Sequence, residues 1–256
     1  MPVKEENDGD VTILTIERPE AHNAVNAETA VALASAIQRF GRNDESNVLV
    51  LTGSGSTSFC AGADLKDIPR LLADAEFCDS VGPMGFAKLD PGKVTIAAVN
   101  GYCFAGGLEL AAWCDFRIAD EQAEFGALNR RWGVPFFDGG TLRLPRIVGL
   151  SNALWMMESG ARFDATRARE IGFVQDVVPA GEALPRAVDL AHHIARYPQE
   201  SLRADRRSIL ASGGYRTDEG LALEDDYRRS SLDNPAVMER LEAFARGERP
   251  ESPRPA

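Results

Sequence analysis

A single carboxylate, Glu109, lies in the stretch 103–115, which reads CFAGGLELAAWCD. A charge among apolar and small residues is costly to bury unless it is paired or used. The pair Gly106-Gly107 precedes it, and the pattern predicts a helix over 106–113. N–H groups at a helix start bind anionic oxygens, and a positioned carboxylate can transfer protons. The stretch therefore indicates carbonyl chemistry; the alternative is a Glu109 that faces solvent or forms a salt bridge.

A second set of backbone donors is expected in the segment 59–65, which reads FCAGADL. The tight turn Ala61-Gly62-Ala63 leaves N–H groups that can point at a ligand oxygen. Each turn alone is an ordinary feature of proteins. If the fold brings this turn beside the start of the 106–113 helix, the two sets of donors form an oxyanion hole, which stabilises negative charge on a carbonyl oxygen.

Other short motifs exclude several kinds of site. Gly53-x-Gly55 follows a strand, but Ser58 stands where a dinucleotide-binding loop has its third glycine. The four cysteines have no metal-ligand spacing, and the three histidines form no set of ligands. We therefore expect neither a dinucleotide nor a metal.

The composition sets the class of protein. The 256 residues, 44% of them hydrophobic, suit one large domain or one domain with a helical appendage. A net charge of −11 argues against nucleic acid as a partner. The sequence has no apolar run long enough for a membrane span and no apolar signal core at its start. We expect a cytoplasmic protein with reduced cysteines.

The elements that must position these residues alternate between strands and helices. Strands are predicted at 11–17, 48–52, 94–99, 116–119 and 173–178. Helices are predicted at 26–40 and 164–170, with Asn26 and Asp164 as N-caps, and from 182 almost to 247, with breaks near Pro198, Gly213-Gly214 and Pro235. The segment 71–93 has weak periodicity and is interpreted as a mobile stretch. The pattern predicts an α/β core at 1–195 and a helical C-terminal region at 196–256 that ends in a flexible tail.

Several stretches resemble the crotonase (enoyl-CoA hydratase/isomerase) superfamily and follow one another in the order typical of that family, over roughly residues 11 to 180. Several independent motifs in the same order make this a specific match. The matching stretches are Arg18-Pro19 with 23–26 (NAVN), 59–65 (FCAGADL), 96–101 (IAAVNG), 105–111 (AGGLELA), 114–119 (CDFRIA), 123–126 (AEFG) and 139–149 (GGTLRLPRIVG).

The resemblance implies a fold, a substrate and a site. The fold would be a spiral of ββα units, with C-terminal helices that build a homotrimer or a dimer of trimers. The substrate would be an acyl-CoA thioester, with no cofactor beyond the coenzyme A of the substrate itself. The N–H groups of Ala63 and Gly106 would form the oxyanion hole, and Glu109 would be an acid/base. The other substrate-binding positions would be Ala61, Asp64, Leu65, Lys66, Gly107 and Asn129. Lys66 would face the nucleotide phosphates; the alternative is a solvated surface lysine.

One position departs from the family's pattern. Hydratases of the family carry a second catalytic glutamate where this sequence has Asn129. Asparagine cannot transfer a proton, and the loss of one acid/base group costs about 10²–10⁴-fold in rate. Asp138, nine residues later, occupies a position where related dienoyl-CoA isomerases carry an acid/base. Asp138 is thus a candidate replacement; the alternative is a turn residue that caps the following segment.

Three functions follow from the resemblance. The first is hydration of an enoyl-CoA double bond by the oxyanion hole and the carboxylates. The second is a dienoyl- or Δ3-enoyl-CoA double-bond isomerase that uses the same site. The third is a catalytically weak acyl-CoA-binding protein, because Asn129 replaces the second glutamate.

Overall fold

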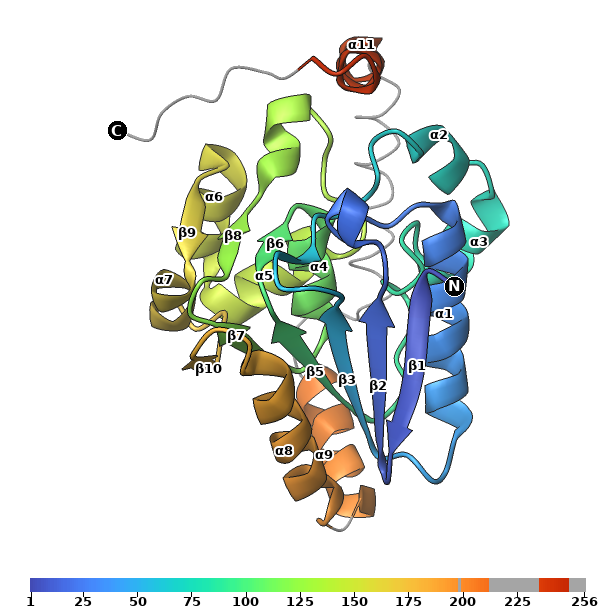
Figure 1. The fold of residues 1–256 in the computed structure, drawn as a ribbon, viewed down its shortest axis with the longest axis vertical. Coiled ribbons are helices and arrows are strands. Elements are labelled where there is room, and N and C mark those ends of the chain that lie inside the picture. Colours follow the sequence, from blue (N-terminus) through green and yellow to red (C-terminus); the bar gives the residue numbers. More distant parts are fainter. Residues whose placement is uncertain (198, 212–234, 249–256) are drawn as a thin grey trace.

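The computed structural model describes residues 1–197, 199–211 and 235–248, which form two sheets surrounded by helices (Figure 1). The large sheet has the order β1-β2-β3-β5-β7-β10, and the small sheet has the order β4-β6-β8-β9. The strands of the large sheet are β1 (Val3–Asp8), β2 (Val11–Ile16), β3 (Val48–Gly53), β5 (Val94–Val99), β7 (Phe116–Asp120) and β10 (Asp176–Val178). Those of the small sheet are β4 (Ser58–Cys60), β6 (Tyr102–Phe104), β8 (Glu124–Gly126) and β9 (Arg162–Asp164).

The chain repeats one unit. It leaves a strand of the large sheet, adds the next strand to the small sheet and then forms helical structure. The three units are β3–β4–α2 (Ile68–Leu71), β5–β6–α4 (Gly106–Trp113), and β7–β8–η2 (Leu128–Trp132) with α5 (Gly140–Val148). Neighbouring strands from successive units are parallel in both sheets. The predicted spiral of ββα units is therefore confirmed.

Helices cover both faces of the large sheet. The helix α8 packs its alanines Ala183, Ala187 and Ala191 against the valine-rich face of β2, β3 and β5. The helices α1 and α4 pack against the opposite face. The helical elements are η1 (Pro19–Ala21), α1 (Ala27–Arg42), α2 (Ile68–Leu71), α3 (Ala75–Val81), α4 (Gly106–Trp113), η2 (Leu128–Trp132), α5 (Gly140–Val148), α6 (Leu150–Ser159), α7 (Ala165–Glu170), α8 (Ala183–Ala195), α9 (Gln199–Ala211) and α11 (Pro235–Ala245).

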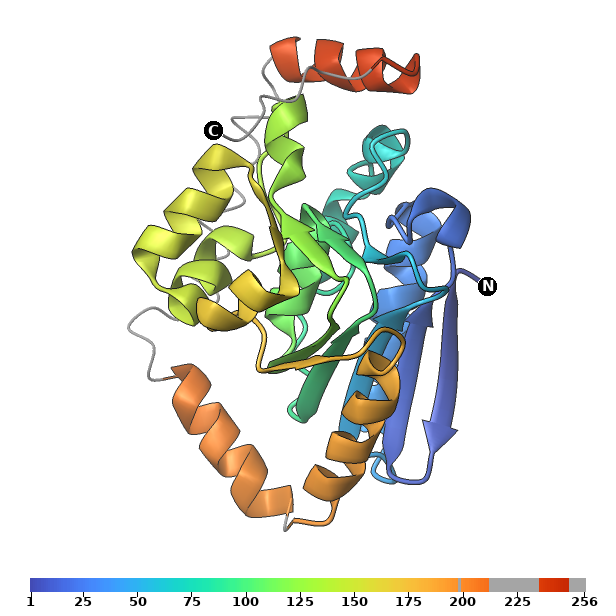
Figure 2. The ribbon, with the colours of Figure 1, turned by 60° about the vertical axis from the view of Figure 1, so that its left-hand side comes forward.

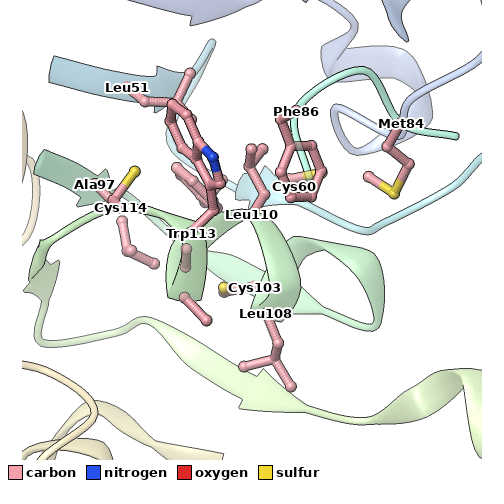
Figure 3. Packing of buried hydrophobic residues seen from close by; sticks show 14 of the residues in the cluster. Leu51, Cys60, Met84, Phe86, Ala97, Cys103, Leu108, Leu110, Trp113 and Cys114 are labelled. Atoms are coloured by element: carbon pink, nitrogen blue, oxygen red, sulfur yellow. The ribbon is translucent and has the colours of Figure 1, made fainter. Parts of the chain in front are cut away.

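The helix α4 lies at the centre of the molecule. All eight of its residues are buried, because the sequence GGLELAAW offers apolar or small side chains around the whole helix. Figure 3 shows Leu108, Leu110 and Trp113 of this helix packed among side chains of other elements, such as Phe86. Glu109 is the only charged residue of the helix.

Most of the predicted elements are confirmed, including both N-caps. The side chain of Asn26 accepts a hydrogen bond from Thr29 N, and that of Asp164 accepts one from Arg167 N. The strand predicted at 173–178 is wrong for its first half. The amides of Phe173 and Val174 donate to Ala168 O, so this part of the chain closes the end of α7 instead of pairing in a sheet.

The weakly periodic segment 71–93 contains α3 and contributes Met84 and Phe86 to the core, both fully buried. The helices α9 and α11 fit the predicted helical C-terminal region. Figure 2 shows α9 at the base of α8 and α11 at the opposite end of the molecule. The edge-on ring contact between Trp132 and Phe244 joins α11 to η2, with 4.7 Å between ring centroids. The breaks predicted at 198 and 213–214 and the tail at 249–256 lie outside the described residues, and the oligomeric role of this region stays a prediction.

Candidate active site

Three parallel strands of the small sheet deliver the candidate residues to one edge. β4 pairs with β6, and β6 pairs with β8. The segment 61–66 follows β4, α4 with Glu109 follows β6, and η2 with Asn129 follows β8. Because the carboxyl ends of parallel strands meet at the same edge of a sheet, these segments lie side by side.

The two predicted donor turns are in contact. A Cβ added to Gly62 would lie 2.6 Å from Gly106 N, so only glycine permits this approach. The backbone bridge between Ala63 and Val25 consists of two hydrogen bonds, from Val25 N to Gly62 O and from Asp64 N to Val25 O. Neither of them uses the N–H of Ala63. Neither Ala63 N nor Gly106 N donates to another residue of the part of the chain that the structure describes. Two unused amides from distant parts of the sequence thus lie beside each other.

The backbone at Ala105 orients the second amide. Ala105 has φ +52° and ψ −121°, a combination that is unfavourable for a residue with a side chain. Its N–H donates to Gly126 O at 2.9 Å, which holds it against the end of β8. Gly106 then begins α4. The first N–H groups of a helix have no acceptor within the helix and carry the partial positive charge of the helix dipole. Strain in this turn therefore accompanies an amide that is available to an electronegative atom.

Glu109 lies inside the protein. It is 2% exposed, and its Oε1 accepts hydrogen bonds from Asp138 N at 2.8 Å and Gly140 N at 2.9 Å. A Cβ added to Gly140 would lie only 2.9 Å from Glu109 Cγ. The two backbone donors fix the plane of the carboxylate, and the alternative of a solvent-facing glutamate is wrong.

Asp138 links Glu109 to the segment 71–93. Its side chain is fully buried, and its carboxylate oxygens accept Met84 N–H at 3.2 and 3.3 Å, while its own N–H donates to Glu109. The alternative of a capping residue is not supported, because α5 has Gly139 as its N-cap and no side-chain cap. Arg143 Nη1 donates to Asp138 O at 3.0 Å and Nη2 donates to Ala87 O at 2.6 Å, so one guanidinium ties the two segments together.

Met84 connects this acid to the donor turns. Its Sδ lies 2.5 Å from the position that a Cβ of Gly106 would occupy, while its own N–H binds Asp138. Figure 3 shows Met84 in the same region of the core as Cys60, which precedes the first donor turn. Burial raises the pKa of Cys60 to about 12, so this thiol stays protonated at neutral pH. The candidate site thus holds carboxylates and amides but no thiolate at Cys60.

The segment 61–66 forms the outer end of the site. The side chain of Lys66 is exposed, whereas Ala61, Ala63, Asp64 and Leu65 are half-buried. Asp64 forms an ion pair with Arg18 Nη2 at 3.0 Å, which ties the segment to the loop before α1. Asp64 therefore positions the turn, and exposure increases from Gly106 through Ala63 to Lys66.

Comparisons with known proteins place this chain in a family. A sequence profile described as enoyl-CoA hydratase/isomerase matches residues 6–251. The chain belongs to this family. It is 35% identical over 225 residues to the crotonyl-CoA hydratase of Syntrophomonas wolfei, with 86% of each chain covered. It is 36% identical over 215 residues to the 2,3-dehydroadipyl-CoA hydratase of Escherichia coli, with 84% of each chain covered. A carnitinyl-CoA hydratase from Mycobacterium avium superposes with a TM-score of 0.88 at 32% identity, over 98% of both chains.

The structure of this enoyl-CoA hydratase/isomerase family member adds residues that the sequence did not single out. Ala105 gave no signal, since alanine rarely adopts a positive φ. Gly82 lies against the second acid, because a Cβ there would lie 2.7 Å from Asp138 Oδ1. Gly140 lies equally close to Glu109, because a Cβ there would lie 2.9 Å from Glu109 Cγ. These glycines could not be recognised from the sequence, because the side chains that approach them come from distant parts of the chain.

Two aromatic residues of the segment 128–138, Phe136 and Trp132, have different neighbours in the structure. Phe136 is buried, and its Cδ1 lies 3.2 Å from the Cβ position of Gly140, beside Glu109. Trp132 packs against Phe244 instead. Of the two, Phe136 is therefore the one that the structure places next to the candidate acid.

Within residues 1–197, 199–211 and 235–248, no three His, Cys, Asp or Glu side chains gather in a way that could hold a metal ion. Over the same ranges, no helix has the length and hydropathy to cross a bilayer.

Proposed function

We propose that this protein adds water to the double bond of an enoyl-CoA thioester. The thioester oxygen binds between the N–H groups of Ala63 and Gly106, which stabilise the negative charge that develops on it during the reaction. This polarisation makes the β-carbon electrophilic and the α-carbon basic in the resulting enolate. Coenzyme A extends along residues 61–66 toward the exposed Lys66.

Glu109 acts as the acid/base of this reaction. As the water oxygen bonds to the β-carbon, Glu109 accepts a proton from the water, and it then donates a proton to the α-carbon of the enolate, so that the carboxylate is regenerated. The bonds from Asp138 N and Gly140 N to Oε1 hold the carboxylate in one orientation, and such positioning lowers the barrier. Asp138 is the second acid/base, in place of the glutamate that the family carries at position 129.

The observation that carries the proposal is the contact between Gly62 and Gly106, three residues before a buried Glu109. It brings two unused amides and one carboxylate to the same strand ends. The relatives named crotonyl-CoA hydratase and 2,3-dehydroadipyl-CoA hydratase support water addition as the reaction class.

A second candidate is a dienoyl- or Δ3-enoyl-CoA isomerase. It is favoured by the full burial of Asp138 next to Glu109, together with an Asn129 that cannot transfer protons. Two acids at one polarised acyl chain can move a proton from one carbon to another without adding water.

The test is a set of turnover assays on the purified protein. With crotonyl-CoA we expect loss of the enoyl-thioester absorbance, and Glu109→Gln should reduce kcat/KM at least about 10²-fold. Glu158→Gln, which changes an exposed carboxylate on α6, is the matched control and should leave kcat/KM unchanged. Turnover of 3-enoyl- or dienoyl-CoA without hydration would favour the isomerase. Binding of acyl-CoA without any turnover would leave only the binding protein.

A further inference from the structure

Asn129 has a buried side-chain oxygen that none of the described residues satisfies. The residue is 6% exposed, and its Nδ2 donates to Val134 O at 2.8 Å. This bond fixes which atom of the amide is the nitrogen, so the opposite atom is Oδ1. Oδ1 is buried and has no hydrogen-bond partner among residues 1–197, 199–211 and 235–248. Because buried acceptors are nearly always satisfied in folded proteins, this oxygen calls for a donor that the described part of the chain does not supply.

The surroundings of Asn129 place it at the candidate active site. It follows β8, whose Gly126 O accepts the N–H of the strained Ala105 just before α4. The next residue, Arg130, has its guanidinium carbon 5.7 Å from the centre of the Phe136 ring. Phe136 in turn lies beside Glu109, across Gly140. Asn129 thus lies in the segment 127–140, whose Asp138 and Gly140 donate hydrogen bonds to Glu109.

We propose that Asn129 Oδ1 accepts a hydrogen bond from the hydroxyl of a 3-hydroxyacyl chain. The inference rests on the proposed function, because it takes the ligand to be an acyl-CoA. A neutral amide oxygen accepts a hydrogen bond but cannot remove the proton, so it recognises a neutral donor. In hydration this donor is the water that becomes the 3-hydroxyl, and in the reverse direction it is the hydroxyl of the substrate. Asn129 is then a specificity-determining residue that distinguishes a hydroxylated chain from a saturated one.

Asn100 provides a matched control within the same chain. It is also a buried asparagine whose Oδ1 has no partner within the part of the chain that the structure describes, and its Nδ2 donates to Gly53 O and Gly55 O. It precedes β6, however, whereas Glu109 follows β6. Asn100 therefore lies at the other end of that strand, and its substitution tests the effect of removing a similar amide away from the acid.

The experiment measures binding rather than turnover. Dissociation constants of (R)- and (S)-3-hydroxybutyryl-CoA and of butyryl-CoA are determined by calorimetry in the Glu109→Gln background, which prevents conversion. Without an acceptor, the hydroxyl would weaken binding because it must lose its own water. With Asn129 we expect one hydroxylated enantiomer to bind about fivefold to tenfold more tightly than butyryl-CoA.

Substitutions at position 129 assign this preference. Asn129→Leu, which removes the acceptor, should abolish it. Asn100→Ala should leave the preference as it was. A purely structural role of Asn129 would weaken all three ligands equally and keep their ratio, which would overturn the inference.

The protein that keeps Asn129 also provides a test. Butyryl-CoA that binds as tightly as both hydroxylated enantiomers would overturn the inference while leaving the proposed function intact. Failure of all three ligands to bind would overturn both.

Discussion

The alanine substitution of Gly140 tests whether Glu109 must keep its observed position. Gly140 begins α5, and its N–H donates to Glu109 Oε1 at 2.9 Å. A Cβ at this residue would lie 2.9 Å from Glu109 Cγ, 3.1 Å from its Oε1 and 3.2 Å from Phe136 Cδ1. All three distances are shorter than ordinary van der Waals contact, so the new methyl group must displace the glutamate.

The size of the effect follows from this overlap. Relief of the shortest contact requires a shift of about 0.5–1 Å, which also lengthens the hydrogen bonds to Oε1. A misplacement of about 1 Å in a reacting group costs on the order of 10²-fold in rate, so we expect kcat/KM for crotonyl-CoA to fall by about 10–10²-fold. Overpacking should cost about 1–3 kcal/mol of the free energy of unfolding, offset in part by the better helix propensity of alanine.

The control is Gly41→Ala in the last turn of α1. A Cβ there would lie 3.5 Å from Pro91, which is ordinary contact. This variant should keep full activity and normal stability. If Gly140→Ala hydrated crotonyl-CoA as fast as the wild type, the position of Glu109 would not matter for the reaction, and the role assigned to it would be refuted.

Two further predictions concern Asp138 and His192. Asp138→Asn keeps an oxygen to accept Met84 N–H but cannot transfer a proton, so kcat should fall by about 10²-fold with little change in the thermal midpoint; unchanged kinetics would make Asp138 a structural residue. Hydrogen bonds that the His192 imidazole on α8 donates, first to Asp8 at 3.1 Å and then to Asp10 at 3.2 Å, raise the pKa of His192. The protonated imidazole therefore stabilises the fold fully below its unfolded pKa of about 6.5, and this contribution is lost as the pH rises through the higher folded pKa. His192→Gln should lower the thermal midpoint by about 1–3 °C near pH 5.5 and much less near pH 9; an equal effect at both pH values would contradict this reasoning.

Much of the fold could be predicted from local sequence. The helix at 106–113 and the caps Asn26 and Asp164 follow from side-chain patterns and short-range hydrogen bonds. The short strands β4, β6 and β8 could not be predicted, because three residues are too few to show a period. The strand β1 has charged, exposed side chains at the edge of the sheet and lacks the apolar alternation that identifies a strand.

The same division holds at the site. Ala63, Gly106 and Glu109 lie in recognisable motifs, and the structure brings their segments together. The hydrogen bond between Met84 N and Asp138 joins residues 54 positions apart, so no local sequence pattern predicts it. The positive φ of Ala105 and the crowding at Gly82 and Gly140 also depend on partners from elsewhere in the chain. Local sequence thus identifies the donors, whereas tertiary contacts decide how the acids are held.

The central claim is that two backbone amides hold one thioester oxygen beside Glu109. A crystal structure of the Glu109→Gln variant with bound butyryl-CoA tests it most directly. We predict that the thioester oxygen lies about 2.7–3.1 Å from both Ala63 N and Gly106 N, with the acyl chain next to residue 109. A thioester oxygen bound elsewhere, or only one of the two amides in contact with it, would contradict the account.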